Sequence, residues 1–278
     1  MIRTRTGPAA RKPEASARPP LVRELLLVAG LFLVYKLGRQ AATRRTGEAF
    51  RNADRVWDWE RALHLPGEGS VQGVLLDSGT LVHLANTYYA TVHFPATVLF
   101  LGWLYWRRPG HYLWARRVLS VLTGAALALH LLMPLAPPRL LAASGLVDTG
   151  QVYGPTVYGE SPGTDALANQ FAAMPSLHVG WALMVAVGLI AATRSRWRWL
   201  WLLHPLLTLL VVIGTANHYW LDALVAVALL TGTVTVIRAP RPRSPRRGSL
   251  VARSAAAQLP PVSPAAPAAP VVTSGAGR

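Results

Sequence analysis

The sequence predicts an all-α integral membrane protein, a bundle of six transmembrane helices with an extra interfacial helical segment between the first and second. Of its 278 residues, 52% are hydrophobic and only 14% are charged, whereas a soluble domain carries roughly a quarter charged residues. The formal net charge is nevertheless +16. The arginines flank long apolar runs, a pattern typical of chains that cross a bilayer several times.

A strongly basic chain can also be a nucleic-acid-binding protein, which presents basic residues interleaved on a folded surface. Here the basic residues stand in tails and between apolar runs, so we expect a membrane bilayer and no nucleic acid as partner. The absence of cysteine excludes disulfide bonds and thiolate metal sites. Neither tail contains a motif that indicates a protein partner.

The N-terminal region predicts a tail followed by a first span. Residues 1–20 mix basic residues with Pro, Ala and Thr, which predicts a disordered basic tail. The apolar run from Leu21 to Leu37 predicts the first membrane helix, with Arg23 and Lys36 reaching the two interfaces. A signal peptide is the alternative interpretation, but the residues after the run make a poor cleavage site.

The next segments predict helices on the membrane surface. Residues 38–70 alternate arginines with acidic residues, and Trp57 and Trp59 suit an interfacial position. Residues 71–86 are apolar but are interrupted by polar residues, among them Asp77 and His83. We interpret this run as a surface or re-entrant helix rather than as a span.

Five further apolar runs each approach the ~20 residues needed to cross a bilayer. Between the third and fourth spans lies a long loop, Leu135 to Met174, and the chain after Ile237 predicts a disordered Arg/Pro/Ala-rich tail, residues 238–278. Residues 21–237 therefore form the membrane domain. The five runs are Tyr88–Trp106, Val118–Pro134, Leu177–Thr193, Trp199–Thr215 and Tyr219–Ile237.

The basic loops predict the orientation, since loops rich in Arg and Lys stay in the cytoplasm. Six crossings put both termini, the Arg107–Arg117 loop and the Arg194–Arg198 loop on the cytoplasmic side. Residues 38–87 and 135–175 then lie outside. A seventh crossing at residues 71–86 would break this parity, and we predict a plasma-membrane protein with both termini in the cytoplasm.

Two histidines and an arginine stand at the outer ends of predicted spans. His218 and Asp222 are four residues apart, so a helix that starts there puts both on one face. A carboxylate beside an imidazole fixes its tautomer. His178 follows Ser176 at the start of another span, and Arg139 follows two prolines at the end of a third. These residue types supply a nucleophile with its orienting carboxylate, a second acid/base and phosphate-binding donors.

Each residue also has a purely structural interpretation. His218 and His178 are also explained as interfacial imidazoles, and Arg139 as an anchor to lipid headgroups. Three such coincidences on one side of the membrane are harder to explain than any one of them. In the functional interpretation an imidazole attacks phosphorus and forms a phosphohistidine, while Arg139, Ser176 and N–H groups at the helix start hold the phosphoryl oxygens.

The motifs Pro-Pro-Arg139, Pro175-Ser176-Leu177-His178 and His218-x-x-x-Asp222, in that order, resemble those of the membrane phosphatidic acid phosphatase type 2 superfamily. They are most similar to its branch containing the fungal inositol phosphorylceramide synthases, an inositolphosphotransferase-like branch. The resemblance covers roughly residues 86–237. It implies a six-helix bundle, nucleophilic His218 assisted by Asp222, proton-shuttling His178, and neither metal nor other cofactor.

The chain departs from that pattern at two positions. The family phosphatases carry a lysine where this chain has Leu132 and an arginine where it has Val212. Two phosphate-binding cations are therefore missing, as in the synthase-like branch. Neutral donors are candidates to replace them, and two aromatic residues of the second span are candidates to line the same cavity, although packing is the commoner role for such residues. The neutral donors are Tyr153, Tyr158, Asn169 and Asn217, and the cavity residues are His93 and Tyr89.

The predicted function is a lipid phosphatase or phosphotransferase that cleaves a lipid phosphoester or pyrophosphate at the outer membrane face through a phosphohistidine. The intermediate passes to water or to an alcohol, and the residues do not distinguish the acceptor. The alternative is a non-catalytic lipid transporter or accessory membrane protein with a decayed site. The missing cations favour the alternative, and the intact set of His178, His218 and Asp222 argues against it.

Overall fold

The computed structural model describes residues 18–42, 45–156 and 170–240, and within these ranges the regular elements are all helices, with one isolated β-bridge between Leu135 and Ala172. The all-α prediction is confirmed for this part of the chain. The tails predicted at residues 1–20 and 238–278 lie almost wholly outside it. The α-helices are α1 (Leu21–Ala42), α2 (Thr46–Ala62), α3 (Glu68–Leu76), α4 (Gly79–Thr91), α5 (His93–Arg107), α6 (Pro109–Leu132), α7 (Thr149–Tyr153), α8 (Leu177–Ala192), α9 (Leu203–Gly214) and α10 (Trp220–Val236), and the 3-10 helices are η1 (Pro138–Leu140), η2 (Ala142–Ser144) and η3 (Arg196–Leu202).

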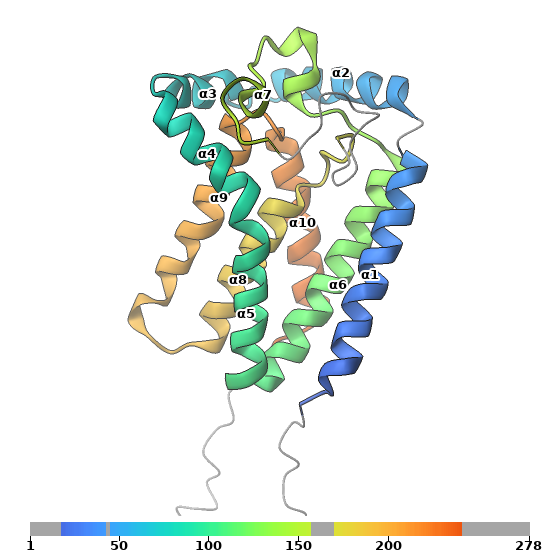
Figure 1. Cartoon of the computed structure of the whole chain (residues 1–278), viewed down its shortest axis with the longest axis vertical. Coiled ribbons are helices and arrows are strands. Elements are labelled where there is room, and N and C mark those ends of the chain that lie inside the picture. The colour runs from blue at the N-terminus through green and yellow to red at the C-terminus, as the bar shows by residue number, and fades with distance from the viewer. Residues whose placement is uncertain (1–17, 43–44, 157–169, 241–278) are drawn as a thin grey trace, which may run out of the picture. The chain divides into compact units, whose positions relative to one another are not determined.

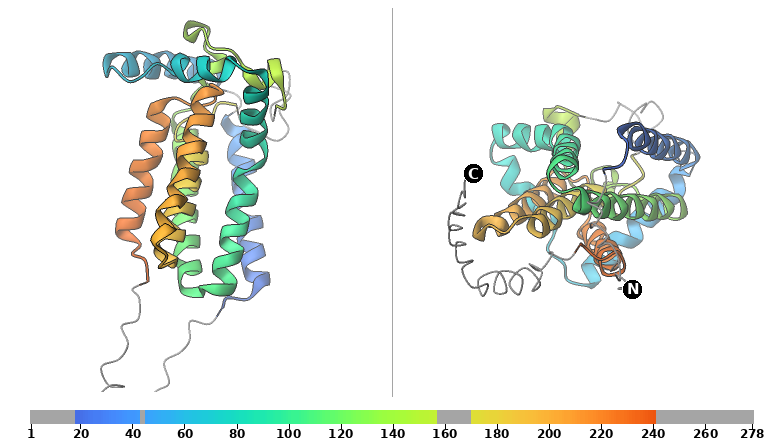
Figure 2. Two further views of the ribbon diagram at one scale, coloured as in Figure 1. Left: turned by 90° about the vertical axis from the view of Figure 1, so that its left-hand side faces the viewer. Right: turned by 90° about the horizontal axis from the view of Figure 1, so that it is seen from below.

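The long helices stand side by side, and α2 and α3 run across one end of them (Figures 1 and 2). Helix α8 lies at the centre and packs against α5, α6, α9 and α10. Because α8 is apolar on all sides, it is suited to burial among other helices. Its Met184 packs with Leu104 of α5, Leu122 of α6 and Leu230 of α10 in one apolar cluster.

The predicted second span is interrupted. Helix α4 ends at Thr91 and α5 begins at His93, so Tyr88–Trp106 is not one continuous helix. Pro95 explains the break, because it has no N–H to donate to the carbonyl of Thr91 and its ring crowds the preceding turn. The run at residues 71–86 is likewise divided between α3 and α4, and the Ser78 hydroxyl caps α4 by accepting from the Leu81 N–H at 3.4 Å.

The predicted loop Arg107–Arg117 is mostly helix, because α6 already begins at Pro109. Arg116 lies within α6 and forms an ion pair with the buried carboxylate of Glu24 in α1. The Tyr112 hydroxyl donates to the same carboxylate at 2.6 Å. Arg116 and Arg117, which the sequence placed in a loop, therefore lie within α6, and the buried carboxylate of Glu24 on α1 compensates the charge of Arg116.

The basic segments gather at one end of the bundle, opposite α2 and α3. Arg18, before α1, donates to the carbonyl of Trp106 at the end of α5, at 2.9 Å. Trp114, near the start of α6, donates to the carbonyl of Ile237 after α10, at 2.6 Å. His111 makes a backbone hydrogen bond with Ala191 at the end of α8. The start of α1, the α5–α6 corner and the ends of α8 and α10 therefore meet (Figure 1).

Two described helical segments are long and apolar enough to cross a membrane, Pro109–Leu132 and Arg196–Gly214. Leu177–Ala192 and Trp220–Val236 are apolar but shorter. The six-span arrangement therefore stays a prediction.

Gly188 tests the close packing of α8 on α5. A Cβ at this position would meet the ring of Phe100, whereas a Cβ on Gly232 of α10 would meet no atom within 4 Å. We expect Gly188→Ala to lower the free energy of unfolding by about 1–3 kcal/mol through overpacking. Thermal unfolding in detergent, followed by fluorescence-detected gel filtration, measures this. Gly232→Ala is the matched control and should leave stability unchanged or raise it; equal effects of the two substitutions would contradict the packing.

Candidate active site

The link between α9 and α10 is a tight turn that presents His218. Ala216 has a left-handed backbone, with φ of 54°, a conformation that costs an L-residue roughly 1–2 kcal/mol. The N–H groups of Asn217 and His218 both donate to the carbonyl of Val212, at 3.0 and 3.2 Å. The turn places the imidazole immediately before α10, among buried atoms.

The imidazole of His218 is held through Nδ1. This atom lies 2.9 Å from the carbonyl oxygen of Ala173 and 3.2 Å from Oδ2 of Asp222. A carbonyl oxygen can only accept a hydrogen bond, so Nδ1 carries the proton. In the neutral ring Nε2 then bears the lone pair, as a nucleophilic imidazole requires.

Asp222 orients His218 from inside the protein. Its carboxylate is fully buried, and Oδ2 also accepts from the backbone N–H of Tyr219 at 2.8 Å. The spacing of four residues predicted that His218 and Asp222 lie on one face of a helix. Because α10 begins at Trp220, His218 instead precedes the helix, and its contact with Asp222 crosses the helix start. The Asp222 carbonyl accepts from the N–H of Ser176 at 3.1 Å, which ties α10 to the start of α8.

His178 lies on the first turn of α8, and its ring centroid is 5.8 Å from that of His218. The ring stacks on Tyr89 and contacts His93, each with centroids 4.5 Å apart. Ser176 is buried, and its hydroxyl caps α8 by accepting from the Val179 N–H at 3.4 Å. Its role in phosphate binding stays a prediction.

The Arg139 guanidinium is surrounded by polar side chains. Nε donates to Oδ1 of Asn217 at 3.0 Å, Nη1 to Oδ2 of Asp148 at 2.8 Å, and Nη2 to Oε1 of Gln170 at 3.3 Å. The Arg139 N–H donates to the carbonyl of Ala216 at 3.0 Å. Arg139 is therefore fixed against the same turn that presents His218, and its charge is balanced by Asp148.

Backbone hydrogen bonds join the segment after α6 to the segment before α8. Leu135, after α6, donates to the carbonyl of Phe171 at 2.9 Å and accepts from the N–H of Ala173 at 3.3 Å. The structure thus brings together three segments that are far apart in the sequence and that carry Arg139, His178 and His218.

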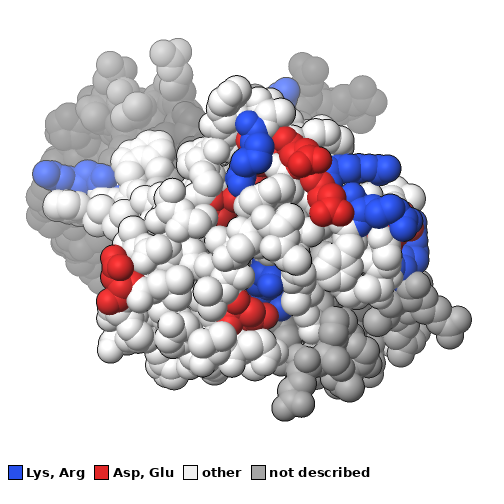
Figure 3. Space-filling view, turned by 90° about the horizontal axis from the view of Figure 1, so that it is seen from above, with Lys and Arg blue, Asp and Glu red and all other residues white. Residues whose placement is uncertain are grey.

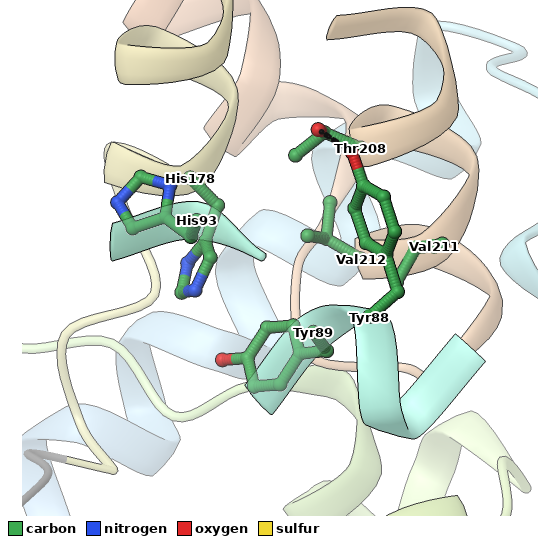
Figure 4. A pocket seen from close by; sticks show the side chains of 7 residues that line it. All are labelled: Tyr88, Tyr89, His93, His178, Thr208, Val211 and Val212. Atoms are coloured by element: carbon green, nitrogen blue, oxygen red, sulfur yellow. Dashed lines mark hydrogen bonds between the residues drawn. The ribbon is translucent and has the colours of Figure 1, made fainter. Parts of the chain in front are cut away.

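Two small cavities border these residues and share Tyr89. One lies between α4, α5, α8 and α9, and the close-up view shows its residues (Figure 4). The other is more polar, and the space free for water is about 10 Å³ in the second and close to zero in the first. The first is lined by Tyr88, Tyr89, His93, His178, Thr208, Val211 and Val212, and the second by Asn86, Tyr89, Asp148, Gly150, Pro155, Thr156 and Asn217.

Some predicted residues lie elsewhere. Tyr153 is exposed on α7 and lines neither of these two cavities. Asn169 and Tyr158 fall outside the described residues. Of the two positions where the family phosphatases carry cations, Leu132 is largely exposed and Val212 is buried in the wall of the first cavity.

Sequence reasoning missed two polar residues that support the site. Asp148 pairs with Arg139. It is the first acidic residue after Arg139 in the sequence, which could have identified it as the counter-charge. His130, buried in α6, places Nε2 at 3.2 Å from the carbonyl of Pro175. No spacing rule links His130 to Pro175, so only the fold reveals it. Within the described ranges, no cluster of three or more His, Asp or Glu side chains could hold a metal ion.

The surface above the site, formed by the end of the molecule that carries α2, α3 and α7, bears acidic and basic side chains on a largely uncharged background (Figure 3). This face has no single sign of charge.

A comparison with protein-family models shows the family of the chain. A family model described as the PAP2 superfamily matches residues 54–236, well over half of the chain. The chain belongs to the PAP2 superfamily, a class generally comprising phosphatases. None of the curated proteins and none of the solved structures compared with the chain matches it. Family membership and the two apolar helical segments indicate a membrane protein.

The tautomer of His218 is open to a direct test. We expect ¹⁵N NMR of histidine-labelled protein near neutral pH to show an imidazole protonated at Nδ1, because Nδ1 faces a carbonyl oxygen that only accepts. His218→Gln identifies the signal by removing it, and His64→Gln, at an exposed histidine, should remove a different signal. A His218 ring protonated at Nε2 alone would contradict the geometry.

Proposed function

We propose that the chain is a membrane lipid phosphatase or phosphotransferase that works through a phosphohistidine on His218 at the outer face of the membrane. The observation that carries the proposal is the double contact of Nδ1 with Ala173 and Asp222. It leaves Nε2 as the basic nitrogen, directed by a buried carboxylate. The ring of His178 lies close enough for both imidazoles to contact one phosphoryl group.

In the first step Nε2 of His218 attacks phosphorus, and the bond from phosphorus to the leaving oxygen breaks. Protonated His178 gives its proton to that oxygen, so the product leaves as an alcohol or a phosphate. Asp222 stabilises the positive charge that develops on the imidazole of His218. The products of the step are the phosphohistidine and the released group.

In the second step an incoming hydroxyl attacks the phosphohistidine, and the bond from phosphorus to Nε2 breaks. His178 takes the proton of the attacking hydroxyl and returns to its starting state. Water as the acceptor gives a phosphatase, and an alcohol gives a phosphotransferase. The motifs are most similar to the inositolphosphotransferase-like branch, which favours transfer from or to a lipid.

Arg139 is the proposed cation for the phosphoryl oxygens, together with Ser176, Asn169 and N–H groups at the start of α8. Since Asp148 already pairs with Arg139, a bound phosphoryl group would share the guanidinium with this carboxylate. Asn217, which accepts from Nε of Arg139, keeps the guanidinium plane in place. Tyr89 and His93, which pack on His178, complete the wall of the site.

The decisive experiment is turnover by purified protein in detergent with EDTA, offered phosphatidic acid, an isoprenyl pyrophosphate, or a phosphoinositide with diacylglycerol. We expect His218→Ala to abolish turnover and Asp222→Asn to lower kcat by on the order of 10³-fold or more, because the imidazole loses its orienting charge. Radiolabelled phosphate from the substrate should be trapped on wild-type protein in an acid-labile, base-stable form.

The controls decide between the candidate functions. Glu48→Ala, on the far end of α2 with a partly exposed side chain, should retain wild-type turnover. Turnover that survives His218→Ala would remove the nucleophile, and turnover abolished by EDTA would indicate a metal enzyme. Lipid binding without turnover would support the non-catalytic alternative, which the apolar residues Leu132 and Val212 favour.

Orientation is tested by cysteine labelling, since the natural chain has no cysteine. We expect Val152→Cys, exposed on α7 beside the site, to react with a membrane-impermeant maleimide on intact cells. Ser195→Cys, exposed at the other end of the bundle, is the matched control and should react only after lysis. The reverse pattern would place the site on the cytoplasmic side.

A further inference from the structure

Two glutamates are completely buried where α2 and α3 cross the end of the bundle: Glu60 near the end of α2 and Glu68 at the start of α3. Glu60 Oε1 accepts from the backbone N–H of Leu221 at 2.7 Å. Glu68 Oε2 accepts from Nη2 of Arg61 at 2.8 Å, and the same nitrogen lies 3.8 Å from Oε2 of Glu60. One guanidinium therefore serves two buried carboxyl groups.

The remaining oxygens of the pair have no donor. Glu60 Oε2 and Glu68 Oε1 are buried without a hydrogen-bond partner among the described residues, yet the two side chains lie within hydrogen-bonding reach of each other. Two ionised carboxylates cannot hydrogen-bond, whereas a carboxylic acid and a carboxylate can. One shared proton satisfies both oxygens and, with Arg61, makes the group electrically neutral.

The ionisation of Glu60 agrees with a shared proton. Burial, the hydrogen bond with Glu68 and the nearby charges of Glu68 and Asp222 raise the pKa of Glu60 from its ordinary 4.5 to about 9, although the Leu221 N–H opposes the rise. The titratable and charged groups that face Glu60 are Glu68 and Arg61 from the α2–α3 side and Tyr219 and Asp222 from the α10 side.

The backbone N–H of Leu221 links the carboxyl pair to the turn of α10 that holds His218. Leu221 belongs to the first turn of α10, where N–H groups have no partner within the helix. Glu60, 161 residues away in the sequence, supplies the missing acceptor. The next residue is Asp222, whose carboxylate holds His218. A shift of this turn would move the carboxylate that orients the imidazole.

We propose that Glu60 and Glu68 share one proton and act as a positioning pair, clamping the first turn of α10 so that Asp222 and His218 keep their alignment. The proposal rests on the function proposed for His218. The pair touches no substrate and acts through α10. When the shared proton is lost, the pair carries two negative charges instead of one, close to the carboxylate of Asp222. The hydrogen bond between Glu60 and Glu68 is lost as well, so the clamp weakens.

The pair predicts a direction of pH dependence. Because the folded-state pKa of Glu60 lies above its unfolded value, the stabilising contribution is complete below about pH 4.5 and is lost as the pH rises towards about 9. We expect wild-type protein to lose thermal stability over this range. Glu60→Gln, which keeps an acceptor for Leu221 and a donor for Glu68 without ionising, should make this loss smaller.

The test compares Glu60→Gln, Glu60→Ala and Glu48→Ala. Glu48 lies on the same helix, pairs with Arg45 and does not reach α10. Hydrogen–deuterium exchange of the peptide covering the first turn of α10 reports the clamp without reference to activity. We expect exchange there to be about fivefold to tenfold faster in Glu60→Ala and unchanged in Glu48→Ala. Turnover of phosphatidic acid should show a lower kcat with little change in KM for Glu60→Ala, rescued in Glu60→Gln.

Two outcomes would overturn the proposal. If Glu60→Gln loses stability with pH as the wild-type protein does, the pair holds no shared proton. If α10 exchanges at the wild-type rate in Glu60→Ala, Glu60 does not clamp it. Should Glu60→Ala fail to fold, the pH profile of Glu60→Gln still decides. If wild-type protein turns over none of the lipid phosphates, the proposed function fails instead, while exchange and pH profile continue to test the pair.

Discussion

The proton on Nδ1 of His218 is the feature on which the rest of the site depends. It is shared between a backbone carbonyl and a buried carboxylate, and each partner comes from a different segment. The carbonyl of Ala173 determines which nitrogen carries the proton, and Asp222 supplies the charge that an imidazolium requires. The tight turn at Ala216, the cap of α8 and the short pairing of Leu135 with the segment 171–173 all place these atoms.

Several buried charges among the described residues are matched locally. Glu24 pairs with Arg116, and Arg139 pairs with Asp148. Glu60 and Glu68, which lie beside the start of α10, share Arg61. Leaving one partner of a buried ion pair alone typically costs about 3–5 kcal/mol, so each pair constrains the helices that carry it. The pairs lie at the two ends of the bundle rather than in its apolar centre.

The sequence was most informative where chemistry and spacing coincide. The all-helical class follows from long apolar runs, and the grouping of Arg139, His178 and His218 followed from applying the charge rule to the loops. Local exceptions were not predictable: Pro95 divides a run that hydropathy presents as continuous, and Arg116 stays in a helix because Glu24 faces it. Glu60 was missed because its backbone partner, Leu221, lies 161 residues away, which no periodicity reports. Asp148 lies only nine residues after Arg139, so its role as a counter-charge was predictable from the sequence.

The main-chain bonds at the site have a consequence for how sequences of this kind can diverge. The carbonyls of Ala173, Ala216 and Phe171 and the N–H groups of Leu135 and Ser176 exist whatever side chain is attached. Only proline, which has no N–H, would delete a donor at Leu135 or Ser176. Side chains in the connecting loops can therefore vary, within the limits of burial, while the backbone keeps the alignment of His218 with Asp222.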